Sequence, residues 1–374
     1  MNPKIENYVK KNGITNFTLS GINVSIANSI RRTLLSDIKT VVFKTTPYEE
    51  NTCNITKNTS RFHNEIIKQR LSCIPIHIKD LNMPIENYIL ELDVENNTDT
   101  TIYVTTKDFK IKNILTEKYL NKEDTLNIFP PNLYTNTFID FLRLRPKLSD
   151  EIPGERIQLN SKFSYGTAKE DGMFNVVSNC SYGFTPDYAK IEVEGNKLKE
   201  SLKDKNMTKE EVVFELSNWR LLDAMRITKQ DSFDFILESV GVFTNSELLE
   251  KACNNIIERL DNVNKLNHNG ELDFKKSTTT MNNCFDIILN NEDYTIGKVI
   301  EYTMYSKYFE GLEGSKKLTY CGFKKMHPHD TYSIIRIAYY QEPSITILQD
   351  NLNDCLLTAI KLFEKIKQLF NKYN

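Results

Sequence analysis

The sequence lacks any apolar run near the roughly 18 residues that a membrane-spanning helix needs. Its first residues, MNPKI, do not begin a hydrophobic signal region, so we expect no membrane contact and a cytoplasmic or nuclear compartment. A charge excess is also missing, because 48 Lys and Arg residues stand against 50 Asp and Glu residues. Proteins that depend mainly on phosphate contacts are usually strongly basic, so direct nucleic-acid binding is not our leading hypothesis.

Paired cysteines are absent as well. The seven cysteines are odd in number and widely scattered, and none forms a C-x-x-C pair or has a histidine at ligand spacing. We expect reduced and mostly buried thiols.

No catalytic motif is present. The segment Gly311–Lys317 has glycines and lysines without the Walker spacing, and the histidines of His327–Asp330 have no cysteines nearby. No Asp-rich motif of the kind that holds two Mg²⁺ ions occurs. We expect the isolated chain not to be an enzyme. A hydrolase or transferase that uses His63, His77 or His327 stays open as an alternative.

What the sequence does contain is amphipathic periodicity. Residues 14–19 read as a strand, and Val24, Ala27, Ile30 and Leu34 then recur at steps of three and four, which predicts a helix with one apolar face. From residue 83 to about 184, short alternating runs broken by proline and glycine predict a β-rich insert.

A second strand and helix follow the insert. Residues 232–238 alternate as a strand, and a helix with an apolar stripe comes next. A polar stretch over 264–283 is the best linker candidate. Beyond it, strand, helix, strand and long helix recur up to residue 370, so the chain contains two versions of one α+β module.

At this point the residues resemble a known family. Residues 17–35, FTLSGINVSIANSIRRTLL, resemble the signature of the alpha subunit of bacterial RNA polymerase and of the third subunit of eukaryotic RNA polymerase II. Segments within 63–76, 165–169 and 235–241 agree with that family in sequence order. Residues 291–300, NEDYTIGKVI, and segments within 321–337 resemble the eleventh subunit of RNA polymerase II.

The resemblance implies an α+β fold in which two alpha-type dimerisation modules form an intramolecular pseudo-dimer, the first module being interrupted by the β-rich insert. The expected parts are a first module, the insert, a linker and a second module, at residues 1–82 with 186–265, 83–185, 266–283 and 284–374 respectively. A single chain with both modules is similar to the fused subunits of large DNA viruses, which implies a viral factory or virion as further possible locations. Eukaryotic relatives bind zinc through cysteines in the insert, but Cys180 is alone between residues 83 and 185, so we expect no metal and no cofactor.

The family implies a non-catalytic assembly platform within DNA-directed RNA polymerase. Its expected partners are the two largest polymerase subunits and small accessory subunits, with DNA reached only through the complex. The residues expected to dock these partners are Asn28, Arg31, Arg32, Glu65, Arg70 and Lys169. The residues expected to pair the modules are Val24, Ala27, Ile30, Leu34, Ile296, Val299, Ile300, Leu352, Leu356 and Phe363.

Several alternatives remain open at this point. Arg31 and Arg32 are also consistent with solvated helix arginines in weak ion pairs, and Asn28 with a polar contact in the strand and helix packing. For the chain as a whole, the alternative is a nucleic-acid-binding or recruitment module outside a polymerase core.

Overall fold

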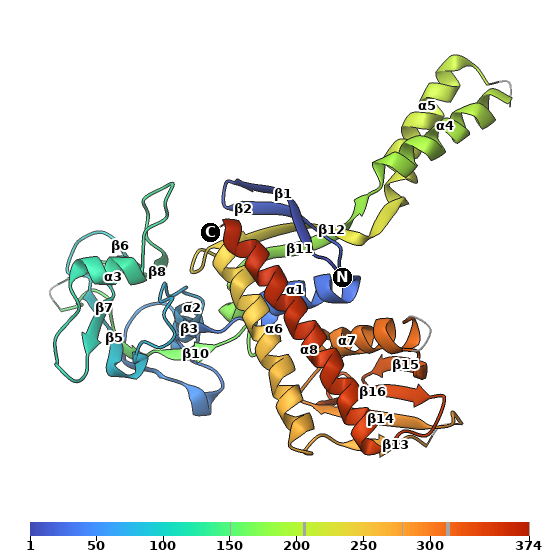
Figure 1. Ribbon diagram of the computed structural model, residues 1–374. Helices are drawn as coiled ribbons and strands as arrows, with labels where there is room; N and C mark the ends of the chain where they lie inside the picture. Colours follow the sequence, from blue (N-terminus) through green and yellow to red (C-terminus); the bar gives the residue numbers. More distant parts are fainter. Residues whose placement is uncertain (150, 205–206, 279, 312–314, 374) are drawn as a thin grey trace. The chain divides into compact units, whose positions relative to one another are not determined.

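The protein separates into two compact units (Figure 1). The structure is a computed structural model that describes residues 1–149, 151–204, 207–278, 280–311 and 315–373. Unit 1 contains residues 1–34, 179–238 and 245–374, and unit 2 contains residues 35–178 and 239–244.

Unit 1 contains two four-stranded sheets with the same arrangement. The first has the order β1-β2-β12-β11 and the second the order β13-β14-β16-β15. The strands of the first are β1 (Lys4–Lys11), β2 (Ile14–Ser20), β11 (Val177–Pro186) and β12 (Thr228–Ser239). The strands of the second are β13 (Phe274–Lys276), β14 (Cys284–Asn290), β15 (Leu318–Lys324) and β16 (Tyr332–Tyr339). In both sheets, two pairs of strands that are consecutive in sequence meet through the second strand of each pair.

The helices repeat in the same order as the strands. Helix α1 (Val24–Ser36) follows β2 and helix α7 (Tyr294–Met304) follows β14. The long helices α6 (Asn245–His268) and α8 (Ile345–Phe370) follow β12 and β16. A five-residue π-helical turn, Tyr305–Phe309, extends α7. The predicted recurrence of one α+β module therefore appears as two strand and helix sets with one topology. The first set contains β1, β2, α1, β11, β12 and α6, and the second contains β13 to β16, α7 and α8.

Local chemistry explains where α1 begins. Gly21 has a φ of +73°, and an added Cβ would collide with the backbone of Asn2, so this turn favours glycine. The side chain of Asn23 then accepts a hydrogen bond of 2.9 Å from the backbone N–H of Ser25, which caps the first turn. The first sheet buries aromatic residues beside this turn, and Phe17 stacks on its cross-strand partner Phe235 with ring centroids 5.0 Å apart.

The connection between β11 and β12 is helical. The charged stretch predicted from about residue 190 lies in α4 (Tyr188–Asp204) as far as residue 204, residues 205–206 lie outside the described residues, and α5 (Lys209–Leu221) follows. Thr208 and Glu211 form a reciprocal capping box at the start of α5. Gly195 in α4 lies against the ring of Trp219 in α5, which lets the two helices approach closely.

Unit 2 is rich in short strands, as the sequence predicts for its central part. Its sheets have the orders β4-β9-β5-β7, β6-β8 and β10-β3. The strands are β3 (Thr40–Val42), β4 (Cys53–Asn58), β5 (Tyr88–Glu95), β6 (Ile102–Thr105), β7 (Lys110–Asn113), β8 (Asp140–Leu144), β9 (Arg156–Lys162) and β10 (Ser164–Gly166). The helices are α2 (Asn64–Ser72) and α3 (Lys122–Ile128).

The limits of unit 2 differ from the expected insert at 83–185. The compact unit begins at residue 35 and its main segment ends at 178. The reason is packing, because Ile67 and Leu71 of α2 share one buried cluster with Leu90 of β5 and Leu159 of β9. The segment 35–82 therefore contributes to the same core as the insert.

The expected linker at 266–283 also differs from the structure. Helix α6 continues through the start of this range to His268, and β13 occupies Phe274–Lys276. Phe274 pairs with Ile287 and Lys276 with Phe285, so the backbone of this polar segment forms an edge strand of the second sheet. The remaining connection from α6 to β13 is short. No helix in the described part of the chain is long and apolar enough to cross a bilayer.

The burial of α8 gives a stability test. Leu356 is fully buried, whereas the next residue, Leu357, is 41% exposed. Leu356→Ala should lower the free energy of unfolding by about 2–5 kcal/mol, because it removes apolar contacts and leaves a cavity. Leu357→Ala should change it by less than about 1 kcal/mol. Urea unfolding followed by circular dichroism measures both, and equal effects would contradict the assigned orientation of α8.

Candidate assembly interface

Helices α6 and α8 of unit 1 lie side by side and run antiparallel. Near the end of α6, the Asn267 side-chain amide donates to the carbonyl of Gln349, near the start of α8, at 2.9 Å. Near the other end of the pair, Lys367 Nζ donates to Asn254 Oδ1 at 2.8 Å. Along their length both helices bury apolar stripes, which contain Leu248, Ala252, Ile256 and Val263 on α6, and Leu348, Leu352, Leu356 and Phe363 on α8. The pair therefore joins the two strand and helix sets.

The end of α8 also packs on the first sheet. Phe370 contacts Phe17 of β2 edge to face, with ring centroids 5.2 Å apart. Tyr373, just beyond the helix, stacks on Tyr8 of β1 at 4.1 Å, and its carbonyl accepts a hydrogen bond of 3.0 Å from Lys10 Nζ. The last helix of the second set thus completes the core of the first set.

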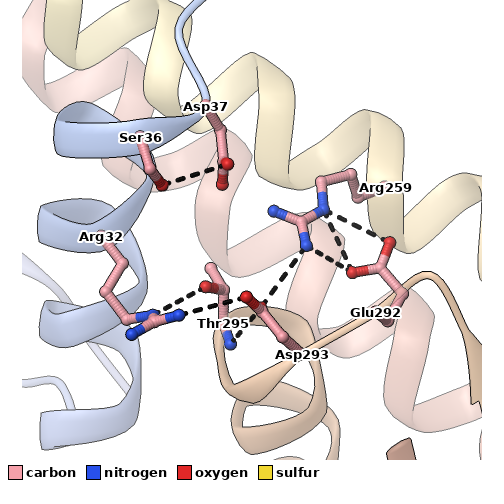
Figure 2. A network of polar contacts seen from close by, with 7 residues as sticks. All are labelled: Arg32, Ser36, Asp37, Arg259, Glu292, Asp293 and Thr295. Atoms are coloured by element: carbon pink, nitrogen blue, oxygen red, sulfur yellow. Dashed lines mark hydrogen bonds and ion pairs between the residues drawn. The ribbon is translucent and has the colours of Figure 1, made fainter. Parts of the chain in front are cut away.

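A polar network joins α1 and α6 to the start of α7 (Figure 2). Arg32 of α1 donates to Thr295 Oγ1 at 2.9 Å and to Asp293 Oδ2 at 3.1 Å. Arg259 of α6 donates from Nε to both carboxylate oxygens of Glu292, at 3.3 and 3.2 Å. The side chains of Arg259 and Glu292 are 16% and 13% exposed, so their ion pair is shielded from solvent. Charged hydrogen bonds of this kind are directional and fix how the helices meet.

Asp293 is the centre of this network. Its carboxylate caps α7 by accepting the backbone N–H of Thr295 at 3.0 Å, and Arg259 Nη2 lies 3.7 Å from Oδ1. Burial on its own would raise the pKa of Asp293. The hydrogen bonds of Thr295 and the charges of Arg32 and Arg259 outweigh that effect, so the pKa lies below its ordinary value. Asp293 is therefore held as a carboxylate in the folded protein.

The residues predicted to pair the modules are buried in all positions but one. On α1, Ala27, Ile30 and Leu34 are almost completely inaccessible, but Val24 is 37% exposed. Val24 precedes Ile30 by six residues, which places it about 120° around the helix from the centre of the buried stripe. Val24 fits the spacing of three and four residues, but it lies at the edge of the buried face of α1.

The other predicted pairing residues lie on α7 and α8. Ile296, Val299 and Ile300 are buried on α7, which packs against α8. An added Cβ at Gly297 would overlap the ring of Phe323 in β15, so this glycine lets α7 lie close to its sheet. Leu352, Leu356 and Phe363 are buried on α8.

Arg31 and Arg32, which the sequence predicts together as docking residues, have different contacts in the structure. Arg32 is engaged inside the chain with Asp293 and Thr295, so its guanidinium joins the two sets of elements. Arg31 is half-buried and donates from Nε to Asn28 Oδ1 at 3.0 Å, one turn earlier on α1. Among the described residues, no carboxylate forms an ion pair with Arg31. The Asn28 amide thus orients Arg31 and leaves its charge uncompensated.

The remaining predicted docking residues belong to unit 2. Glu65 lies in the first turn of α2 with its side chain 82% exposed and accepts from His63 Nδ1 at 2.8 Å. Arg70 donates to the backbone carbonyls of Phe141 and Asp140, at 2.6 and 2.7 Å, and so ties α2 to β8. Lys169 is exposed.

The three histidines considered for catalysis are divided between the two units. His63 and His77 belong to unit 2 and His327 to unit 1. Burial lowers the pKa of His77, which makes the neutral imidazole the favoured form. His327 Nδ1 accepts the backbone N–H of His329 at 3.2 Å in an exposed loop. Within the described ranges, no three His, Cys, Asp or Glu side chains gather as a metal site.

Sequence reasoning did not single out Arg259, Glu292 and Asp293 as functional residues. The nearest signal was the acidic pair directly before the helix that begins at about residue 294, because a helix N-terminus favours a capping aspartate. Nothing local in the sequence connects that cap with arginines on two distant helices.

The network gives a pH-dependent prediction. Asp293→Asn should lower the free energy of unfolding near neutral pH by about 1–3 kcal/mol, because charged hydrogen bonds are lost. A lowered pKa contributes stability above the unfolded carboxyl pKa of about 3.9, and this contribution disappears as the pH falls through the folded pKa. The difference from the native chain should therefore shrink below about pH 4.

The matched control is Asp350→Asn, which removes an exposed carboxylate on α8. This control should change the free energy of unfolding by about 0.5 kcal/mol or less. Urea titrations at a series of pH values provide the comparison. A penalty for Asp293→Asn that stays constant into acid would show that the carboxylate does not stabilise the network.

Comparison with known proteins places this arrangement in a family. The chain is 24% identical over 276 residues to the DNA-directed RNA polymerase subunit Rpo3 of Methanosphaera stadtmanae, which covers 66% of this chain and 92% of that subunit. It is 25% identical over 301 residues to the DNA-directed RNA polymerases I and III subunit RPAC1 of Bos taurus, covering 66% of this chain and 81% of the relative. The family model of the RNA polymerase Rpb3/Rpb11 dimerisation domain matches residues 16–260. Because this match spans more than half of the chain and includes α1 and most of α6, the chain belongs to the RNA polymerase Rpb3/Rpb11 dimerisation domain family.

Proposed function

We propose that this chain is a non-catalytic assembly subunit of a multisubunit DNA-directed RNA polymerase, on which the two largest subunits are held. The observation that carries the proposal is the family match over residues 16–260, together with archaeal and mammalian relatives that are named as polymerase subunits. In this role the chain positions other subunits, small accessory subunits included, and reaches DNA only through the complex.

The proposal includes both halves of the platform in one polypeptide, as an intramolecular pseudo-dimer. Support comes from the equal strand orders of the two sheets and from the antiparallel packing of α6 on α8. The matched relatives account for 66% to 71% of this chain, and the family match ends at residue 260, before the second sheet begins. A short connection gives an effective concentration near the millimolar range, so pairing does not wait for a separate subunit.

The proposed division of the chain follows from the sequence with two adjustments. The first module consists of β1, β2, α1, β11, β12 and α6, and the second contains β13 to β16, α7 and α8. The second module therefore includes part of the expected linker, and the inserted unit includes residues 35–82 as well as most of 83–185. A fused arrangement of this type also supports a viral source, with a viral factory or the virion as the location.

Docking of the large subunits is assigned to polar groups that the chain leaves available to a partner. Arg31 presents a half-buried guanidinium without a carboxylate partner among the described residues, and Glu65 presents an exposed carboxylate. Arg70 and Lys169 add positive charge on unit 2. Guanidinium groups suit carboxylates and backbone carbonyls of a docked protein. Arg32 is reassigned to pairing of the modules.

The test is purification of the tagged chain from the cells in which it is naturally made. The two largest polymerase subunits should be recovered in stoichiometric amounts, with DNA-dependent RNA synthesis in the eluate. The double variant Arg31→Glu with Glu65→Lys leaves the net charge unchanged and should lower recovery of the large subunits by about tenfold or more, since docked charge pairs become repulsive.

Lys361→Glu with Glu117→Lys is the matched control, because both side chains are exposed and the net charge again stays the same. This control should recover the full complex. Circular dichroism verifies that both variants fold. Recovery of the native chain without any polymerase subunit would contradict the proposed function, and equal recovery by both variants would remove Arg31 and Glu65 from the docking surface.

A further inference from the structure

Four arginines surround one pocket of unit 2 that has a volume of about 400 Å³. Arg61 precedes α2 and Arg70 lies within it, while Arg143 lies in β8 and Arg145 just after that strand. Apart from Arg70, these arginines are absent from the docking residues that the sequence predicts.

The pocket carries uncompensated positive charge. Its lining contains two carboxylates, Asp140 and Glu155, so four guanidinium groups leave a formal charge of +2. Glu155 is buried, and its carboxylate accepts hydrogen bonds from the backbone N–H of Arg145, at 2.7 Å, and from the Arg145 guanidinium. Arg143 approaches Asp140 only to 3.7 Å, which is longer than a direct hydrogen bond.

The other two arginines have no carboxylate partner among the described residues. Arg70 donates to two backbone carbonyls, which hold the guanidinium in place without neutralising it. Arg61 is exposed and forms no ion pair with any described side chain. The oriented guanidinium of Arg70 and the guanidinium of Arg61, which forms no ion pair with a described residue, therefore both line the pocket.

Apolar surface lies next to these charges. Leu142 is buried at the wall of the pocket, and Phe62 is 38% exposed with the Arg70 guanidinium 5.7 Å from its ring centre. A ligand that satisfies both features carries carboxylates beside an apolar side chain. Guanidinium forks bind carboxylates in a bidentate manner, and a pocket of this size accommodates a few side chains.

A polynucleotide fits these observations less well than a peptide. Asp140 remains 44% exposed at the rim. Its negative charge repels a phosphodiester, whereas its carboxylate oxygens can accept a hydrogen bond from a peptide N–H. The whole chain has a formal net charge of −2, so it lacks the broad basic surface on which a nucleic-acid strand lies.

We infer that the arginine pocket binds a short acidic segment of another protein chain, with carboxylates at Arg61 and Arg143 and an apolar side chain against Phe62. The inference rests on the proposed function in one respect, namely that the chain acts by holding other subunits. It adds the chemistry of one partner segment and places the contact in unit 2.

The test uses the full chain and a random short-peptide display library as the probe, so no polymerase subunit is needed. Selection on the native chain should enrich peptides that combine two or more Asp or Glu residues with Leu or Phe. An enriched peptide, synthesised with a fluorescent label, should bind in an anisotropy titration. Arg61→Glu with Arg143→Glu should weaken that binding by about tenfold or more.

Two further variants complete the comparison. Arg61→Gln with Arg143→Gln removes charge without reversing it and should also weaken binding, which protects the test if the reversed variant fails to fold. Lys57→Glu with Lys118→Glu changes the net charge by the same amount as the reversed variant, at exposed residues outside the pocket, and should leave binding unchanged.

Three outcomes would overturn the inference. Enriched peptides without acidic residues would exclude a carboxylate site, and equal binding by the arginine variants would place the peptide elsewhere. Tighter binding of a short single-stranded oligonucleotide than of the peptide, lost in the arginine variants, would assign the pocket to nucleic acid. Because co-purification of the large subunits is measured separately, the pocket can fail while the proposed function stands, and the reverse also holds.

Discussion

The antiparallel packing of α6 on α8 is the interaction on which the rest of unit 1 depends. Each of these long helices has an apolar stripe that must be removed from water. By packing on one another, the two helices bury their stripes and connect the two sheets. The contacts of Phe370 with Phe17 and of Tyr373 with Tyr8 extend this core onto the first sheet, so the core of the first strand and helix set includes the end of α8.

The polar network at the start of α7 gives this packing its register. Apolar stripes tolerate small shifts along a helix, whereas Arg32 and Arg259 meet carboxylates that are fixed by a helix cap and a short loop. The same constraint explains why two adjacent arginines on α1 differ in role. Arg32 is used within the molecule, whereas Arg31 is held by Asn28 and is the arginine that we propose for docking.

Much of the fold could be predicted from the sequence because the helices are amphipathic and the module recurs. Nine of the ten predicted pairing residues are buried in the apolar stripes of α1, α7 and α8. Val24 is exposed because it lies at the edge of the apolar face of α1. Strands β1 and β13 could not be predicted, since both are edge strands whose polar residues follow no alternation and whose order comes from backbone pairing. The ion pair of Arg259 with Glu292 was not predicted, because it joins distant segments and local sequence patterns do not indicate such contacts.

Cleavage of the connection between α6 and β13 tests the central claim most directly. A protease site inserted between Asn269 and Gly270, which are exposed at the end of α6, would divide the chain without removing a buried residue. After cleavage, sedimentation at about micromolar concentration should show the two fragments as one complex, because an interface of the obligate kind keeps its partners together at that dilution. Two separate folded fragments in the same measurement would contradict the account.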